Sequence, residues 1–165
     1  MILYHGSILE VPNPEILQNE IGRDFGFAFY TTDIKAQAER WAIRKAKLAN
    51  RKSGSYAVGI VSVYEWNEVD SALTIKQFQG ASMEWLDLVV KCRSDITFSH
   101  DYDIVIGNIA NDNVGETVSY VVQGIMRKED AIERLKFEKI NNQIAFCTSK
   151  ALEELKYQRF YELKG

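Results

Sequence analysis

Apolar and polar residues follow two different rhythms along the chain, and together these rhythms predict strands interrupted by helices. The run Tyr56–Trp66 is β-branched and apolar on both faces, so it predicts a central strand. Shorter apolar runs predict further strands at residues 2–5, 27–32, 73–78, 102–110, 143–148 and 157–163. Because helices interrupt these strands at irregular intervals, the pattern favours an α+β fold with mostly antiparallel strands in a curled or split sheet.

The longest predicted helix begins at Asp33, continues to about Lys52 and ends at Gly54. Asp33 is expected to cap it by accepting from the unpaired amide groups of the first turn. Its buried face is predicted from four residues at helical spacing, namely Ile34, Ala38, Trp41 and Leu48. Shorter helices are expected at 14–19, at 83–93 after a Ser82 cap, at 115–124 and 128–137, and at 150–155 after a Ser149 cap.

Length and composition predict one domain spanning residues 1–165, because 165 residues with 46% apolar side chains suffice for a single core. The net charge of −3 gives no footprint for general nucleic-acid binding, although it leaves room for a local basic groove. We find no signal peptide and no apolar run of about 18 residues. A cytoplasmic protein without a membrane partner is therefore expected.

The two cysteines and the second histidine carry little chemistry at this stage. Cys92 and Cys147 lie in apolar surroundings, without metal-ligand spacing and without a histidine close in sequence, which predicts buried free thiols. His100 stands beside Asp101 and Asp103, and three such residues can ligate a metal. Their spacing matches no common template, so we expect a solvated loop and no metal site.

Three separate stretches carry the candidate binding residues. His5 stands at a strand end before Gly6, where an imidazole can donate to a hydroxyl and a glycine lets a ligand approach the backbone. Tyr30 ends a strand and Trp41 follows eleven residues later on the next helix, so both rings can border a pocket. Gln143 precedes an apolar strand and either faces water in a turn or hydrogen-bonds a ligand.

A further polar cluster ends the strand predicted at 102–110. Asn108, Asn111 and Asp112 can either hold a loop through side-chain to backbone hydrogen bonds or reach a substrate. The residues alone do not rank these two roles. A Walker-type loop, a dinucleotide-binding glycine fingerprint and a Gly-x-Ser-x-Gly elbow are all absent from the sequence.

Taken in order, three segments resemble the signature segments of ADP-ribosyltransferases of the diphtheria toxin and poly(ADP-ribose) polymerase type, which use a His–Tyr–Glu triad. They are Leu3–Ser7, Gly26–Asp33 and Asn142–Phe146. The chain is also similar to a family of small uncharacterised bacterial proteins near that fold, with residues 102–112 as a further mark. The resemblance covers residues 3 to about 150 and implies a split, mostly antiparallel sheet with flanking helices.

The resemblance implies that NAD is the substrate and assigns a role to each candidate. His5 would bond the adenosine-side ribose, Gly6 would contact the nicotinamide amide through its backbone, and Tyr30 and Trp41 would sandwich the nicotinamide ring. Gln143 stands where the family often has its catalytic glutamate. A neutral amide lacks that charge, so the site transfers slowly, borrows a carboxylate such as Glu138 or Asp112, or only binds NAD. Ala38 is a second departure, since the polymerases usually have a serine there.

We therefore predict a mono-ADP-ribosyltransferase with catalytic residues Gln143, Tyr30 and His5. Net acidity slightly favours a protein over a nucleic acid as the macromolecular acceptor. Family analogy implies a bacterial toxin restrained by an antitoxin or immunity protein. Two alternatives remain open: a non-catalytic NAD-binding or protein-interaction module, and an NAD glycohydrolase that uses water as acceptor.

Overall fold

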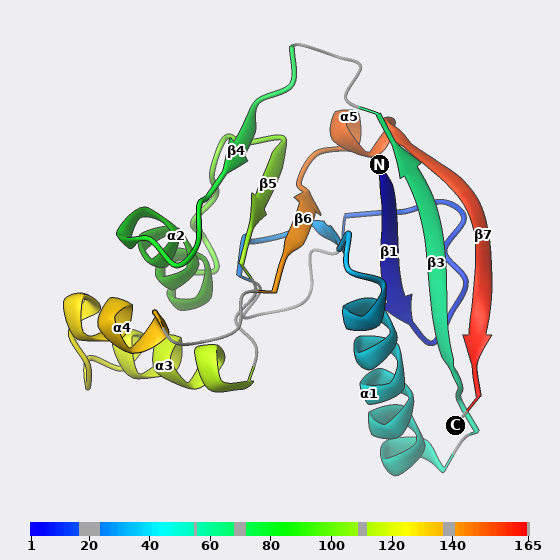
Figure 1. The fold of residues 1–165 in the computed structure, drawn as a ribbon, viewed down its shortest axis with the longest axis horizontal. Helices are drawn as coiled ribbons and strands as arrows, with labels where there is room; N and C mark the ends of the chain where they lie inside the picture. The colour runs from blue at the N-terminus through cyan, green and yellow to red at the C-terminus, as the bar shows by residue number, and fades with distance from the viewer. Residues whose placement is uncertain (17–23, 55, 68–71, 109–111, 137–140, 165) are drawn as a thin grey trace.

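Two β-sheets meet along one short seam, and each sheet carries helices on its outer face (Figure 1). The computed structural model describes residues 1–16, 24–54, 56–67, 72–108, 112–136 and 141–164, without the side chains of 112 and 113. The first sheet has the order β1 (Ile2–Ser7), β3 (Gly59–Trp66), β7 (Leu155–Leu163). The second has the order β2 (Phe29–Thr31), β6 (Gln143–Phe146), β5 (Ile104–Gly107), β4 (Ile75–Gln77). The helices are α1 (Lys35–Ser53), α2 (Met83–Ser94), α3 (Asp112–Val122), α4 (Lys128–Leu135) and α5 (Ser149–Leu152).

The fold is α+β, as the pattern predicts, because all strand pairings except the parallel β4–β5 pair are antiparallel. The expected central strand is confirmed, since β3 lies between β1 and β7. One bridge joins the two sheets, with Tyr4 and Thr32 exchanging backbone hydrogen bonds of 2.8 and 2.9 Å. We call this β1–β2 junction the seam.

Alternating side chains divide the interior into layers. Residues such as Leu3, Phe29 and Phe146 point inward and form a cluster between the two sheets. On the outer face of the four-stranded sheet, α2, α3 and α4 cover a second cluster that includes Tyr30 and Ala145. On the outer face of the three-stranded sheet, α1 covers a small third cluster. The two outer faces meet at the seam, because Tyr4 and Thr32 are direct partners there.

Helix α1 packs much closer to its sheet than a helix with large contact residues can. A Cβ atom added at Gly6 would lie 2.2 Å from the Ala38 carbonyl oxygen, and one at Gly59 would lie 3.0 Å from the Ala42 carbonyl carbon. The buried face of α1 is accordingly made of small residues and one amide, namely Gln37, Ala38, Ala42 and Ala46. The predicted face is therefore wrong at Leu48, which is 47% exposed.

The helix ends separate correct capping predictions from wrong ones. Ser82 accepts from the Trp85 amide, and Gly54 ends α1 in the left-handed region at φ 65°, as expected. Asp33 does not cap α1: the Thr32 hydroxyl accepts from the Ile34 amide, while Asp33 accepts from the Asn142 side chain. Thr148, and not Ser149, caps α5.

Some expectations fall largely outside the described residues. The helix predicted at 14–19 is described only for residues 14–16, which are not helical. Residues 109 and 110, at the end of the strand predicted at 102–110, and Asn111 of the polar cluster are not described. Among the helices that are described, none combines the length and apolar character needed to cross a membrane.

Candidate functional site

His5 ties the first strand to the second at the seam. Its Nδ1 lies 2.7 Å from the Tyr30 carbonyl oxygen, and its ring stacks on Phe29 with centroids 4.3 Å apart. A carbonyl oxygen can only accept, so Nδ1 carries the proton, and Nε2 of the neutral ring is an acceptor. A ribose hydroxyl would therefore donate to His5, which reverses the direction expected from the sequence.

Gly6 presents its peptide groups along the edge of β1 that faces away from β3. Tyr4 uses that same edge to bond Thr32, and residues two apart in a strand direct their N–H and C=O groups the same way. The Lys45 ammonium donates to the Gly6 carbonyl at 3.1 Å, which confirms the direction. The carbonyl oxygen has a second lone pair, and no described residue accepts from the Gly6 amide.

The Tyr30 hydroxyl makes two hydrogen bonds to the backbone of the preceding segment. Its hydroxyl donates to the Gly26 carbonyl at 2.5 Å and accepts from the Phe25 amide at 3.1 Å, while its ring is only 8% exposed. These bonds anchor the segment that precedes β2 against the outer face of the four-stranded sheet. Tyr30 is therefore a fixed and largely buried side chain.

Gln143 lies on the same sheet face as Tyr30. Tyr30 pairs with Ala145, so Gln143 is its diagonal neighbour across the β2–β6 ladder, about 7–8 Å away. The Gln143 carboxamide is 3% exposed and donates from Nε2 to Asp24 Oδ2 at 3.3 Å. That contact orients the amide and leaves Oε1 as its accepting end.

The Asp24 carboxylate, which accepts from this amide, is also bonded by an arginine. Its Oδ1 accepts from Arg93 Nε at 2.9 Å and from Nη2 at 2.6 Å, so one guanidinium of α2 makes two hydrogen bonds to this carboxylate. The aspartate side chain is 7% exposed and the arginine side chain 23%, which makes this a largely desolvated pair. Gln143, Asp24 and Arg93 thus form a polar chain from β6 to α2, and sequence reasoning missed two of its three members.

Helix α1 closes the same end of the site through Gln37. This buried amide donates to the Asn142 carbonyl at 2.8 Å and accepts from the Asn142 amide at 3.3 Å. Trp41 is half-buried and lies one turn further along, on the same side of α1 as Gln37. Ala38, at the position of the family's serine, is fully buried beneath β1.

The candidate residues therefore converge only in part. The structure joins His5 to the Tyr30 backbone and places Tyr30 and Gln143 on one outer face. Trp41 lies in α1, one turn after the Gln37 that bonds Asn142. The His5 ring itself lies on the opposite face, against Phe29. His5 and Gln143 accordingly belong to two sides of the same seam.

A hollow of about 430 Å3 lies beside Gly26, and His100 and Cys147 are among its lining residues. The Cys147 sulfur is 3.7 Å from His100 Nε2, a pair that sequence distance concealed. His100 Nδ1 accepts from the Tyr102 amide, so Nε2 carries the proton and donates to the Phe25 carbonyl at 2.8 Å. This nitrogen is not a base for the thiol, and burial raises the pKa of Cys147 to about 12. The pair is structural.

The other polar candidates have structural partners or lie outside the description. Asp103 accepts from the Thr74 amide at 2.9 Å and from the Thr148 hydroxyl at 2.8 Å, which lowers its pKa. Asn108 is buried, and its carbonyl accepts from the Trp85 indole. Neither Asn111, Glu138 nor the Asp112 side chain is described. Within the described residues, no three ligand-type side chains come together as a metal site.

Comparison with known proteins places the chain in one family. A family model described as "Protein of unknown function (DUF3990)" matches residues 1–157, so the chain belongs to that family. Searches of curated proteins and of solved structures gave no match.

Proposed function

We propose that this member of the DUF3990 family binds NAD at the seam and transfers a single ADP-ribose unit to a macromolecular acceptor. The observation that carries the proposal is the Gly6 peptide next to His5. Its N–H and C=O groups point to the strand edge beyond the Tyr4–Thr32 bridge. A primary carboxamide such as that of nicotinamide offers the complementary pair, one C=O and one N–H, just as a neighbouring strand would.

The surrounding residues suit further groups of NAD. In the neutral His5 ring, Nε2 can accept from a hydroxyl of the adenosine-side ribose, because Nδ1 donates to the Tyr30 carbonyl. The half-buried Trp41 ring of α1 supplies a planar surface against which a nicotinamide ring can stack, and the largely buried Tyr30 supports this end of the site from β2. Gly6 packs so closely on Ala38 that a larger residue at position 6 would clash with α1 beside this edge.

Gln143 supplies the acceptor for the ribose 2′-hydroxyl. The Asp24 carboxylate bonds its Nε2, and hydrogen bonds in such chains polarise one another, so Oε1 becomes a stronger acceptor than an isolated amide. As the C1′–N bond breaks, the electron pair leaves with neutral nicotinamide and positive charge develops on the ribosyl group. A nucleophilic oxygen or nitrogen of the acceptor then bonds C1′ and loses its proton.

The test exchanges the two partners of this hydrogen bond. In the double variant Asp24→Asn/Gln143→Glu, an amide still faces a carboxylate, and Arg93 still has a carboxylate within the network. The full charge now stands at position 143, so nicotinamide release from NAD should rise by about 10²- to 10³-fold, the typical effect of one positioned electrostatic group. Gln143→Ala should lower release, and each variant's melting temperature controls for folding.

Two outcomes would end the proposal. The first is absence of nicotinamide release from both the wild type and the exchange variant, together with no NAD-induced rise in melting temperature at millimolar NAD. The second is equal release by the wild type, the exchange variant and Gln143→Ala. Gln143→Glu alone is a poor test, because it sets two carboxylates against one guanidinium in a buried site.

The neutral charge of Gln143 favours one other candidate, a module that binds NAD without cleaving it. In that case NAD raises the melting temperature of the wild type, while nicotinamide appears only with the exchange variant. Transfer is recognised by labelled acceptor in lysate supplied with NAD carrying a labelled adenylate, and release without any labelled acceptor assigns hydrolysis by water.

A further inference from the structure

The outward side of α1 carries a concentrated positive charge. The helix contains seven lysines and arginines and one acidic residue, a net charge of +6 in a chain whose net charge is −3, so the remaining residues carry −9. Its one carboxylate, Glu39, accepts from the Tyr161 hydroxyl at 2.8 Å and is thereby engaged by β7. Lys45 points inward to Gly6, and Lys35 lies over the Tyr161 ring.

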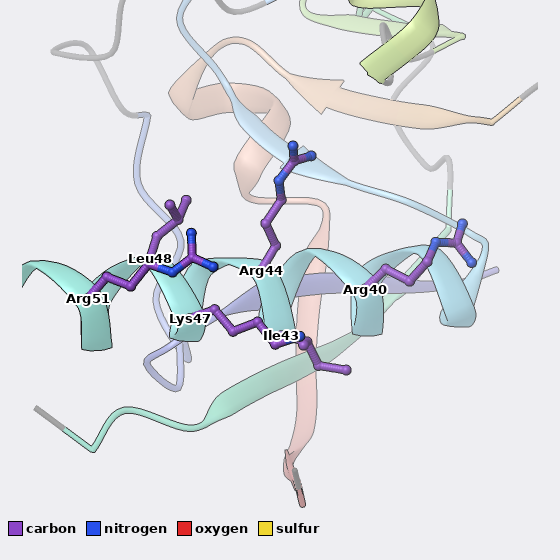
Figure 2. A pocket seen from close by; sticks show the side chains of 6 residues that line it. All are labelled: Arg40, Ile43, Arg44, Lys47, Leu48 and Arg51. Carbon is purple, nitrogen blue, oxygen red and sulfur yellow. The ribbon is translucent and has the colours of Figure 1, made fainter.

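Four other cations, Arg40, Arg44, Lys47 and Arg51, line an open groove of about 450 Å3 along the helix. Figure 2 shows these side chains projecting from α1. They belong to two rows at four-residue spacing, Arg40–Arg44–Leu48 and Ile43–Lys47–Arg51. All six side chains are exposed, and no carboxylate lines the groove. Within the described residues, no ion pair joins Arg40, Lys47 or Arg51 to an acidic side chain. We call these six residues the basic groove.

We propose that the basic groove binds the phosphate backbone of a nucleic acid, which is then the acceptor that reaches the seam. The binding stands on the groove alone, and the acceptor role rests on the proposed function. From Arg40 to Arg51 the helix rises about 16 Å, long enough to follow several phosphates of one strand. Three of the four cations are arginines, whose planar forks bond phosphate oxygens in pairs.

The composition of the groove argues against an acidic protein as the partner. The cores of protein interfaces are depleted in charged residues and enriched in aromatic ones. Here four of the six residues are charged and none is aromatic. The two apolar side chains, Ile43 and Leu48, stand in different rows and form no apolar core. Contacts to a nucleic-acid backbone are made by lysine and arginine and need no apolar core.

The location fits an acceptor site. Arg40 lies one turn beyond Gln37, which bonds Asn142 next to Gln143, so the groove starts beside the seam and runs away from it. Helix α1 is also locked to β1 and β3 by its close glycine contacts, so the groove keeps a fixed position relative to Gly6. The net charge of the whole chain conceals this local feature, which is why composition favoured a protein acceptor.

The test measures binding of a fluorescein-labelled 20-nucleotide DNA single strand, its duplex and the corresponding RNA strand by fluorescence anisotropy at 50 to 200 mM salt. The variant Arg40→Gln/Lys47→Gln/Arg51→Gln keeps helix propensity, which far-UV circular dichroism checks. The matched control Arg134→Gln/Lys156→Gln/Arg159→Gln removes the same charges from exposed positions in α4 and β7. The two triple variants therefore separate the basic groove from bulk charge.

For the wild type and the control, four phosphate contacts predict that duplex affinity falls about 100-fold between 50 and 200 mM salt. The groove variant should bind at least about tenfold more weakly at 50 mM salt and show a slope of about −1. Three results would overturn the proposal: no binding by the wild type at 50 mM salt, equal loss in both triple variants, or displacement of the probe by polyglutamate as effective as by unlabelled DNA.

A parallel measurement keeps this inference separate from the function proposed above. Nicotinamide release without added nucleic acid is measured for both triple variants, and labelled ADP-ribose on the oligonucleotide is measured with it. Binding without any release from NAD refutes only the transferase proposal. Release of nicotinamide without oligonucleotide binding refutes only the proposal that the basic groove binds nucleic acid.

Discussion

The two halves of the split sheet are held to their helices in opposite ways. On the four-stranded half, α2, α3 and α4 bury large side chains, among them Trp85, Leu86 and Phe78. On the three-stranded half, α1 meets its sheet through glycines and alanines at near-contact distance between backbones. The four-stranded half is therefore stabilised by the burial of large side chains, and the three-stranded half by the close approach of the α1 backbone to its sheet.

The two sides of α1 differ accordingly. Its inner side contacts the sheet through small residues, and its outer side carries arginines and lysines. On the four-stranded half, the described parts of α2, α3 and α4 contact one another and share a buried cluster with the sheet. The comparison predicts that removing volume damages one half and adding volume damages the other.

The largest expected effect is the loss of Trp85 on the large-residue half. This side chain is fully buried, and its indole donates to the Asn108 carbonyl at 3.1 Å. Trp85→Ala should lower the free energy of unfolding by about 3–5 kcal/mol in urea denaturation, because it leaves a cavity and an unpaired carbonyl. Met83→Ala on the same helix, at a position 38% exposed, is the control and should change stability by about 0.5 kcal/mol or less. A loss below about 1.5 kcal/mol at Trp85 would contradict the volume argument.

The next effect comes from adding a single methyl group on the close-packed half. Gly6→Ala should cost about 2–3 kcal/mol, since the new Cβ lies 2.2 Å from a helix carbonyl that can move only with α1. Gly59→Ala, with 3.0 Å to the Ala42 carbonyl carbon, should cost less. Gly54→Ala meets no atom within 4 Å and should lose only about 1 kcal/mol through its left-handed backbone. Thermal unfolding of the three variants checks the order, which a larger loss at Gly54 than at Gly6 would refute.

The third prediction concerns the reactivity of the two thiols on the four-stranded half and involves no change in stability. Burial raises the pKa of Cys92 and of Cys147 to about 12, well above that of an exposed cysteine. At pH 7.5 the thiolate fraction should then be about 10³-fold below that of an exposed cysteine, and it should rise tenfold per pH unit until about pH 12. Alkylation by iodoacetamide, followed by mass spectrometry, should be correspondingly slow in the native protein and fast in urea. Labelling of either thiol at the rate of free cysteine would show that this half is open.

Part of this architecture is readable from local sequence. The β-branched run of β3 predicts a strand buried on both faces, and Ser82 and Gly54 predict helix boundaries, because each depends on neighbouring residues alone. The face of α1 is not readable in this way. Pattern analysis selects large apolar residues such as Leu48, whereas the glycines of β1 and β3 dictate small ones, and those glycines are distant in the chain.

The candidate site shows the same limit. His5, Tyr30 and Gln143 were found from their local segments, but their surroundings depend on tertiary contacts. Asp24 bonds Gln143 across 119 residues, and His100 approaches Cys147 across 47. Asp33 lost its predicted capping role because the Thr32 hydroxyl competes for the helix start and Asn142 engages the carboxylate. Such competition between partners has no signature in the sequence.

The pairing of β7 with β3 has a consequence for how the protein is made. β3 stands in the middle of its sheet, yet its second partner, β7, follows it only after several other helices and strands, with Gly59 opposite Leu163. During synthesis, β1, α1 and β3 leave the ribosome before β7, so one side of β3 has unpaired backbone groups until β7 has been made. The three-stranded sheet under α1 is therefore completed only after the four-stranded sheet has been synthesised.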